Sequence, residues 1–251
     1  MPMINETMTS SDHRTQGALG ACALAASIVS GAYAFPALAG LGALRRLRPP
    51  LGIADHTLDG RGYGLTFDDG PHCKGTPAVL EALAARGVRA TFFLVGEQVA
   101  RNPSLAAEIV AAGHGIGLHC DRHRNQLRLG PRAVREDILR GAARIEETTG
   151  APILRYRPPY GIFNAAALAL VRANGWRPLL WTHWGRDWQA RATPDSIFAT
   201  LVGAEVGEGS VLLLHDADDY SAEGSWRRTA AALPRVLAEL EGRGMAWSLA
   251  V

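Results

Sequence analysis

The sequence predicts an α/β fold in which seven short strands alternate with helices and form a barrel that need not be complete. Two observations carry this prediction. From residue 63 onward, short apolar runs alternate with longer amphipathic segments. The runs are apolar at consecutive positions, which is typical of strands buried on both faces of a parallel sheet. Strand–helix alternation predicts right-handed βαβ units, and seven units are too many for a small open sheet.

Seven segments are expected to be strands because they are short, apolar and in part β-branched or aromatic. They are residues 63–67, 90–95, 115–118, 153–156, 178–181, 210–214 and 246–251. With the helices between them, these strands predict one folded domain over residues 63–251.

Helix signals lie between these strands. Asn102 and Thr193 each precede a proline, which places an N-cap residue before a proline at the first helical position. Asn164 can cap a further helix, and a glycine follows most of these segments. We expect helices over residues 77–86, 103–112, 131–149, 165–173, 194–206 and 225–241.

Charge and cysteine content exclude two classes of function. The 26 basic and 24 acidic side chains give a formal net charge of +2, which offers no electrostatic reason to expect nucleic-acid binding. Three cysteines (Cys22, Cys73 and Cys120) are too few for a disulfide framework. The sequence has no Cys-x-x-Cys pair, which excludes a thiolate zinc knuckle. We expect Cys73 and Cys120 to be ordinary reduced thiols.

The N-terminal region divides into three parts. Residues 1–16 are polar and expected to be disordered, residues 17–44 carry no charge, and residues 45–62 form a linker. The uncharged part admits three interpretations: a membrane anchor, an export signal cleaved near residues 37–39, or a helix packed on a soluble domain. Three arginines follow it, a bias that the positive-inside rule associates with the cytoplasmic side. We favour a membrane-associated segment, in a protein bound to the membrane or exported to the cell envelope, and leave its sidedness open.

Two adjacent carboxylates follow the first predicted strand, at the end where the chemistry of α/β barrels gathers. Asp68 and Asp69 could simply belong to an Asp-Asp-Gly-Pro turn. Adjacent carboxylates repel each other, however, unless a cation or an arginine lies near. One of them could bind a metal ion while the other, pointing elsewhere, acts as a base.

Two histidines, His119 and His123, follow the third strand with a spacing of four residues. On a helical turn, this spacing puts both imidazoles on one face, where they can share a metal ion. Two histidines and one aspartate leave coordination positions open, which suits a catalytic rather than a structural metal.

Three later strand ends carry residues suited to acid–base chemistry. Arg157 would lower the pKa of a nearby carboxylate, and its alternative is a surface salt bridge. Tyr160 follows two prolines, in a rigid turn that could aim a backbone N–H at a fixed point. His215, with Asp187 as its partner, could donate a proton, although a structural histidine in the core is the alternative.

Taken in order, these residues resemble the motifs of the polysaccharide deacetylases of carbohydrate esterase family four. The resemblance covers residues 63–251 and extends to the chitooligosaccharide deacetylases of that family. Five motifs in the family's order make it specific. They are Thr66-Phe67-Asp68-Asp69-Gly70-Pro71, His119 with His123, Arg157-Pro158-Pro159-Tyr160-Gly161, Arg186-Asp187-Trp188 and Leu213-Leu214-His215-Asp216.

The resemblance implies a distorted (β/α) barrel and the removal of acetyl groups from sugars that contain N-acetylglucosamine. It also implies one divalent metal ion, with zinc as the first candidate. The metal ligands would be Asp69, His119 and His123.

The same resemblance implies a role for each remaining motif residue. Asp68 would be the general base, with Arg157 beside it. His215 would be the general acid, with Asp187 beside it. The Tyr160 N–H would help to stabilise the oxyanion, and the acetyl methyl group would lie against Trp188 and Leu213.

Two positions depart from the family pattern. Cys120 stands where the family usually has serine or threonine, and a thiol is a poorer hydrogen-bond partner than a hydroxyl. Trp184 replaces an aspartate of the fourth motif, which could change how the substrate is placed. Two alternatives stay open: a related-fold hydrolase of non-sugar amides, and a catalytically silent glycan-binding envelope protein. We expect a monomer that acts on an N-acetylated glycan.

Overall fold

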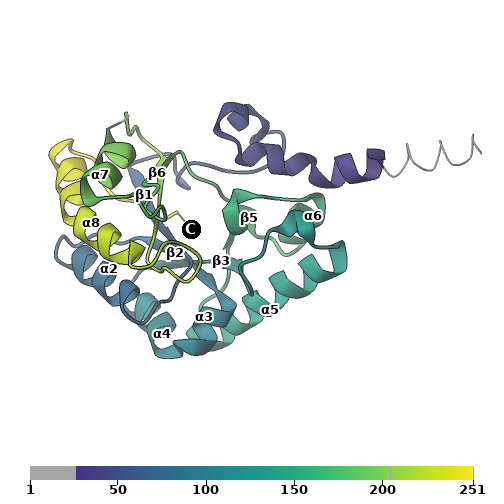
Figure 1. Ribbon diagram of the computed structural model, residues 1–251, viewed down its shortest axis with the longest axis horizontal. Helices are drawn as coiled ribbons and strands as arrows, with labels where there is room; N and C mark the ends of the chain where they lie inside the picture. Colours follow the sequence, from purple (N-terminus) through teal and green to yellow (C-terminus); the bar gives the residue numbers. More distant parts are fainter. Residues whose placement is uncertain (1–26, 204, 251) are drawn as a thin grey trace, which may run out of the picture.

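Seven parallel strands form one curled sheet, with helices arranged around it (Figure 1). The computed structural model describes residues 27–203 and 205–250. The strands are β1 (Tyr63–Asp68), β2 (Thr91–Val95), β3 (Gly115–Cys120), β4 (Arg155–Tyr156), β5 (Arg177–Pro178), β6 (His183–Trp184) and β7 (Ser210–His215). Their order is β5-β4-β3-β2-β1-β7-β6, so β5 and β6 are the two edges and the sheet is an incomplete barrel. The predicted seven-stranded (β/α) architecture is confirmed.

Helices cover the outer face of this sheet (Figure 1). They are α2 (Gly75–Ala84), α3 (Gly96–Arg101), α4 (Pro103–Ala111), α5 (Pro131–Thr149), α6 (Ala165–Ala173), α7 (Pro194–Val202) and α8 (Ser225–Gly242). The predicted bounds of α5 and α6 agree with the structure at both ends. Asn164 caps α6 as expected, because its side chain accepts a hydrogen bond from the Ala167 N–H at 2.8 Å. The short helix α3 was not predicted.

The central strands place polar residues at one end of a buried sheet. Every residue of β1, β2 and β3 is buried, and the Phe67 and Phe92 rings stack with centroids 5.1 Å apart. β1 pairs with β7 in a register that sets Asp68 beside His215. Because all the pairings are parallel, the carboxyl ends of the strands meet at the same edge, where barrel chemistry is found.

One predicted strand was wrong, and another was missed. Residues 246–250 make only an isolated bridge, between Tyr63 and Trp247. Around this bridge, the Tyr63 N–H donates to the Ala246 carbonyl and the Ser248 N–H donates to the Tyr63 carbonyl. The ladder does not continue to Ala250, whose N–H donates to Thr91 Oγ1 and whose carbonyl accepts from Arg155 Nε. The seventh strand is instead β6, which pairs with β7 through His183 and Trp184.

The N-terminal part of the described chain packs against the barrel. Residues 27–34 are helical, and two 3-10 helices follow, η1 (Phe35–Gly40) and η2 (Gly42–Leu47). The Tyr33 hydroxyl donates to the Leu129 carbonyl at 2.7 Å and accepts a hydrogen bond from Asn164. The polar segment 1–16 and the first part of the uncharged segment, 17–26, lie outside the described residues. None of the helices in the described part of the chain combines the length and apolar character needed to cross a membrane.

Residues 45–62, expected to be a linker, contact the segment after β5 and the first residue of β7. Ala54 forms a parallel bridge with Leu179, just beyond β5, and His56 forms an antiparallel bridge with Ser210 in β7. Arg48 is buried and donates to the Trp181 carbonyl at 2.7 Å. These contacts lie on the side where the barrel is open between β5 and β6.

Candidate active site

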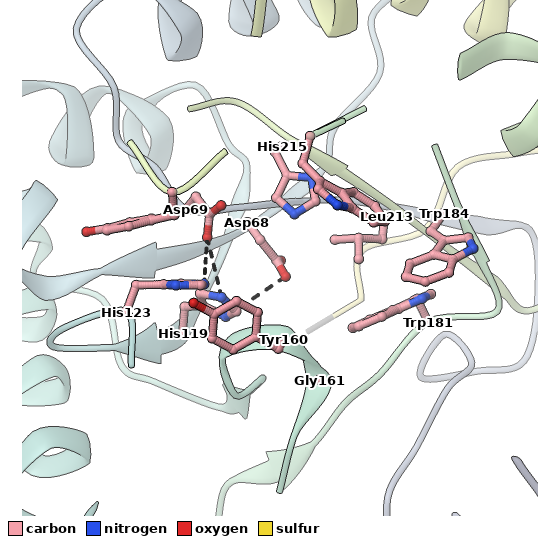
Figure 2. A pocket seen from close by; sticks show the side chains of 12 residues that line it. Asp68, Asp69, His119, His123, Tyr160, Gly161, Trp181, Trp184, Leu213 and His215 are labelled. Carbon is pink, nitrogen blue, oxygen red and sulfur yellow. Dashed lines mark ion pairs between the residues drawn. The ribbon is translucent and has the colours of Figure 1, made fainter. Parts of the chain in front are cut away.

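A cavity of about 290 Å³ opens at the carboxyl ends of the strands (Figure 2). Most of the residues singled out from the sequence line it, whereas Arg157 and Asp187 are fully buried behind it. The lining residues are Asp68, Asp69, His119, His123, Tyr160, Gly161, Trp181, Trp184, Trp188, Leu213, His215 and Tyr220. The structure therefore brings all ten predicted site residues to one place.

Asp69 and the two histidines form a compact group on one side of the cavity. Asp69 Oδ1 lies 3.5 Å from His119 Nε2 and 3.4 Å from His123 Nε2. His119 Nδ1 is 2.8 Å from the Arg157 carbonyl, to which only an N–H can donate, so the lone pair of the neutral ring is on Nε2, facing Asp69. Asp69 Oδ1 is buried without a hydrogen-bond partner among the described residues. Three potential ligand atoms thus converge within 4.8 Å of one another.

The electrostatics of this group suit a cation. Burial lowers the pKa of His119 and of His123 to about 3, so both rings are neutral at physiological pH. Burial also raises the pKa of Asp69 to about 7, and the nearby carboxylates of Asp68 and Asp216 act in the same direction. A buried carboxylate beside two neutral imidazoles is stabilised in its charged form by a metal ion. The donor set therefore fits a divalent cation.

Asp68 points away from its neighbour and is held by a buried arginine. Arg157 Nη1 donates to Asp68 Oδ1 at 2.7 Å and to Thr66 Oγ1 at 2.9 Å. The guanidinium lies 4.0 Å from the centroid of the Phe93 ring. Burial raises the pKa of Asp68, while the charge of Arg157 opposes this rise. The surface salt bridge considered as an alternative for Arg157 is wrong, because this side chain is 0% exposed.

His215 and Asp187 form a hydrogen-bonded pair at the carboxyl end of β7. His215 Nδ1 donates to Asp187 Oδ1 at 2.9 Å, and the His215 backbone N–H donates to Asp187 Oδ2 at 2.7 Å. The hydroxyl of Thr229 donates to the same Oδ2 at 2.7 Å. Burial disfavours the charged imidazole, but the charge of Asp187 outweighs burial and raises the pKa of His215 to about 10. At neutral pH both ring nitrogens of His215 are therefore protonated, and the imidazole is positively charged.

The turn after β4 presents backbone atoms to the cavity. Tyr160 has left-handed dihedral angles (φ 60°, ψ 7°), which are uncommon for a residue other than glycine. The N–H groups of Gly161 and Ile162 bond to the carbonyls of Pro158 and Pro159. Among the described residues, the Tyr160 N–H makes no hydrogen bond, and Tyr160 lines the cavity.

Comparison with known proteins decides the family. A family model described as polysaccharide deacetylase matches residues 45–179. The chain is 35% identical to the peptidoglycan-N-acetylglucosamine deacetylase of Bacillus cereus, over 72% of this chain and 82% of that protein. It is also 35% identical to the chitooligosaccharide deacetylase of Azorhizobium caulinodans, over 72% and 89%.

The chain belongs to the polysaccharide deacetylase family. Solved structures agree with this assignment. A peptidoglycan N-acetylglucosamine deacetylase bound to 4-naphthalen-1-yl-N-oxidanyl-benzamide has a TM-score of 0.72 and 27% identity, over 79% of this chain and 90% of that chain. A pseudoenzyme of carbohydrate esterase family four from Bacillus anthracis has a TM-score of 0.67 and 26% identity, over 75% and 63%.

Three site residues of this family member were missed from the sequence. Trp181 lines the cavity from the segment between β5 and β6. Tyr220 stacks on the His123 ring with centroids 4.4 Å apart, and its hydroxyl donates to Glu97 at 2.6 Å. Thr229 orients Asp187 from α8, as described above. Each contact joins segments that are far apart in the sequence, and no local pattern marks them.

The loop that carries His123 is held from α5. Asp137, which is buried, accepts hydrogen bonds from the backbone N–H groups of Asp121 and Arg122, each at 3.2 Å. It also accepts a hydrogen bond from the Arg124 side chain at 2.7 Å. Cys120 is a free, buried thiol, and burial raises its pKa well above the usual value. Asp137 thus fixes the loop in this polysaccharide deacetylase, whatever Cys120 contributes.

Three further acidic and imidazole groups cluster elsewhere, at His72, Asp218 and Asp219. His72 Nδ1 accepts a hydrogen bond from the Gly75 N–H at 2.9 Å, so the proton of the neutral ring is on Nε2, which faces Asp218 at 3.4 Å. The atom nearest the carboxylate is therefore a donor. This cluster is an imidazole N–H beside two carboxylates, and its chemistry differs from that of the Asp69 group.

Proposed function

We propose that the chain is a metal-dependent hydrolase that removes acetyl groups from N-acetylated sugars. One observation carries the proposal. The buried group of Asp69, His119 and His123 lies in the same cavity as a carboxylate held by Arg157 and an imidazole held by Asp187. A cation site, a base and an acid around one cavity are the parts that amide hydrolysis needs.

Asp69, His119 and His123 would hold one divalent ion, with zinc as the first candidate because two imidazoles and a carboxylate are ligands that it accepts. When bound, such an ion polarises a carbonyl and lowers the pKa of water. The chain supplies the proton transfers. Asp68, oriented by Arg157 at 2.7 Å, takes a proton from the attacking water as general base.

His215 serves as the general acid. Its Nδ1 is engaged by Asp187, so the proton on Nε2 is free to move to the amine nitrogen as the carbon–nitrogen bond breaks. The Tyr160 N–H donates to the oxygen that gains charge in the transition state. Trp188 and Leu213, which both line the cavity, would contact the acetyl methyl group.

The sugar specificity rests on the family. The two relatives described above are named for deacetylation of N-acetylglucosamine in peptidoglycan and of chitooligosaccharides. We therefore propose a poly- or oligosaccharide containing N-acetylglucosamine as the substrate. We also propose a place at the cell envelope, with the uncharged N-terminal segment as a membrane contact, for which the peptidoglycan substrate in one relative's name is the support.

The proposal is tested by acetate release from a panel of chitooligosaccharides and peptidoglycan fragments, with the metal content of the same sample determined by elemental analysis. We expect acetate release that disappears with a chelator and returns with Zn²⁺. Stoichiometric metal without acetate from any glycan would favour the catalytically silent alternative. Turnover confined to cyclic imides would favour the related-fold hydrolase.

A further inference from the structure

Two tryptophans extend the wall of the cavity beyond the residues already given a role. Trp181 and Trp184 stack with ring centroids 5.9 Å apart and an interplanar angle of 28°, and Trp188 lies 5.0 Å from Trp184. Trp184 in β6 pairs with Leu213 in β7, so both side chains project from the same face of the sheet. Figure 2 shows Trp181 and Trp184 on the far side of Leu213 from Asp69 and its histidines.

Both indole rings are fixed by their neighbours. Trp181 packs on Gly161, where a Cβ atom would come within 2.7 Å of the ring. The Arg186 guanidinium lies 5.1 Å from the Trp184 centroid. The pair is therefore a preformed apolar surface that begins where the Leu213 contact ends.

The cavity is larger than an acetyl group requires. It measures about 290 Å³, whereas three heavy atoms, at roughly the 30 Å³ of a liquid water molecule each, fill less than about 100 Å³. Trp181 and Trp184 line this cavity on the far side of Leu213 from the metal ligands. Apolar groups that enter such a space gain affinity from burial.

We propose that Trp181 and Trp184 form an acyl subsite that takes straight aliphatic N-acyl groups longer than acetyl. This inference rests on the proposed function and deepens it by naming the acyl class. The reaction is unchanged: water adds its oxygen to the acyl carbon, the carbon–nitrogen bond breaks, and the fatty acid leaves as the amine takes a proton. Each methylene buried against the indoles is worth roughly fourfold in kcat/KM at most.

A sugar ring stacked on the same indoles is the competing occupant. It would change the kinetics of all acyl substrates to the same degree, because the sugar is common to them. The acyl subsite instead makes the effect depend on chain length. The ratio of kcat/KM between a longer acyl compound and the acetyl compound therefore distinguishes the two occupants, whereas an absolute rate does not.

The test uses the full chain loaded with Zn²⁺ and chitobiose derivatives that carry N-acetyl, N-propionyl, N-butyryl or N-hexanoyl groups. The amine released is measured with fluorescamine. We expect kcat/KM for the butyryl compound to equal or exceed that for the acetyl compound. Trp184→Asp is expected to lower the butyryl-to-acetyl ratio by more than about tenfold, because a charge then meets the chain. Trp184→Phe is expected to keep most of the ratio.

Trp247→Phe is the matched control, because Trp247 lies outside the cavity lining, and it is expected to leave the ratio unchanged. A fall of about tenfold or more from acetyl to butyryl in the unaltered chain overturns the inference, whether or not the variants fold. An equal loss on all substrates in Trp184→Asp also overturns it, in favour of the sugar. Release of amine from the acetyl compound alone overturns the acyl subsite but leaves the proposed function standing. Release of no amine from any compound overturns both the acyl subsite and the proposed function.

Discussion

Asp187 engages His215 through both carboxylate oxygens. One oxygen accepts from the imidazole Nδ1–H at 2.9 Å and the other from the His215 backbone N–H at 2.7 Å. Backbone and side chain are thus fixed by the same group, which is itself fully buried. The ring can present only Nε2 to the cavity, and its orientation does not depend on a substrate.

Replacing Asp187 by asparagine should therefore change the pH dependence of turnover. The negative charge raises the pKa of His215 to about 10, so the acid stays protonated well above neutral pH. Without that charge the pKa falls, and His215 loses its proton at a lower pH. We expect the alkaline limb of kcat/KM to move to lower pH and kcat to fall by about 10²–10⁴. Asp195→Asn, at a side chain that is 88% exposed, is the control, and an unmoved alkaline limb in Asp187→Asn would contradict the assignment.

Two further variants separate the base from the metal ligands. Asp68→Asn keeps a hydrogen-bond acceptor for Arg157 but cannot take up a proton, so turnover should fall by at least about 10² while the metal stays bound. His123→Ala removes one of the three ligands, so metal and turnover should be lost together. Elemental analysis and acetate release on the same samples check both. Full activity on an acetylated chitooligosaccharide in Asp68→Asn would rule out Asp68 as the base.

The site was largely predictable because its signals are local. Asp68 and Asp69 are adjacent, and His119 and His123 are four residues apart, so each pair shows in the sequence without knowledge of the fold. The rule that chemistry gathers at the carboxyl ends of parallel strands then joins the two pairs. The helices α5 and α6 were predicted at both ends for the same reason, because proline, asparagine and glycine mark their boundaries.

The remaining features depend on contacts between distant segments. β6 has two residues, too few to show a periodicity, so Trp184 was expected in a loop after a strand at 178–181. The strand expected at 246–251 is as apolar as a real strand. Its described part, however, pairs with the backbone of Tyr63 only, and the Thr91 and Arg155 side chains take the backbone bonds of Ala250. Tyr220 and Thr229 reach the site from elements whose position only the folded sheet defines.

Thr229 is expected to act as a positioning residue for the acid. Thr229→Val removes the hydroxyl that donates to Asp187 Oδ2 at 2.7 Å and leaves a side chain of similar shape. Loss of one buried hydrogen bond should cost about 1–3 kcal/mol of stability. A less well-held carboxylate should lower kcat more than it changes KM. Thr229→Ser should restore kcat, whereas a purely structural role would lower the melting temperature without this selective loss.

The control for Thr229 is Thr200→Val. Thr200 is exposed, and within the described part of the chain its hydroxyl bonds only to the carbonyl of Ser196 in α7. We expect kcat of this variant to equal that of the unaltered chain. A loss of kcat in Thr200→Val as large as that in Thr229→Val would mean that the loss in Thr229→Val does not come from the bond to Asp187.

Asp137 is expected to control metal affinity although it binds no metal. Asp137→Ala frees the backbone N–H groups of Asp121 and Arg122 and the Arg124 side chain, and so loosens the loop that carries His123. Supporting groups of this kind typically change metal affinity by about 10–100-fold. We expect a larger Zn²⁺ dissociation constant, measured by competition with a chromogenic chelator, and activity that returns when the Zn²⁺ concentration is raised. Glu136→Ala, at the exposed neighbouring position, should bind Zn²⁺ as the unaltered chain does. Equal affinity in Asp137→Ala would show instead that β3 and the Tyr220 stacking suffice to hold His123 in place.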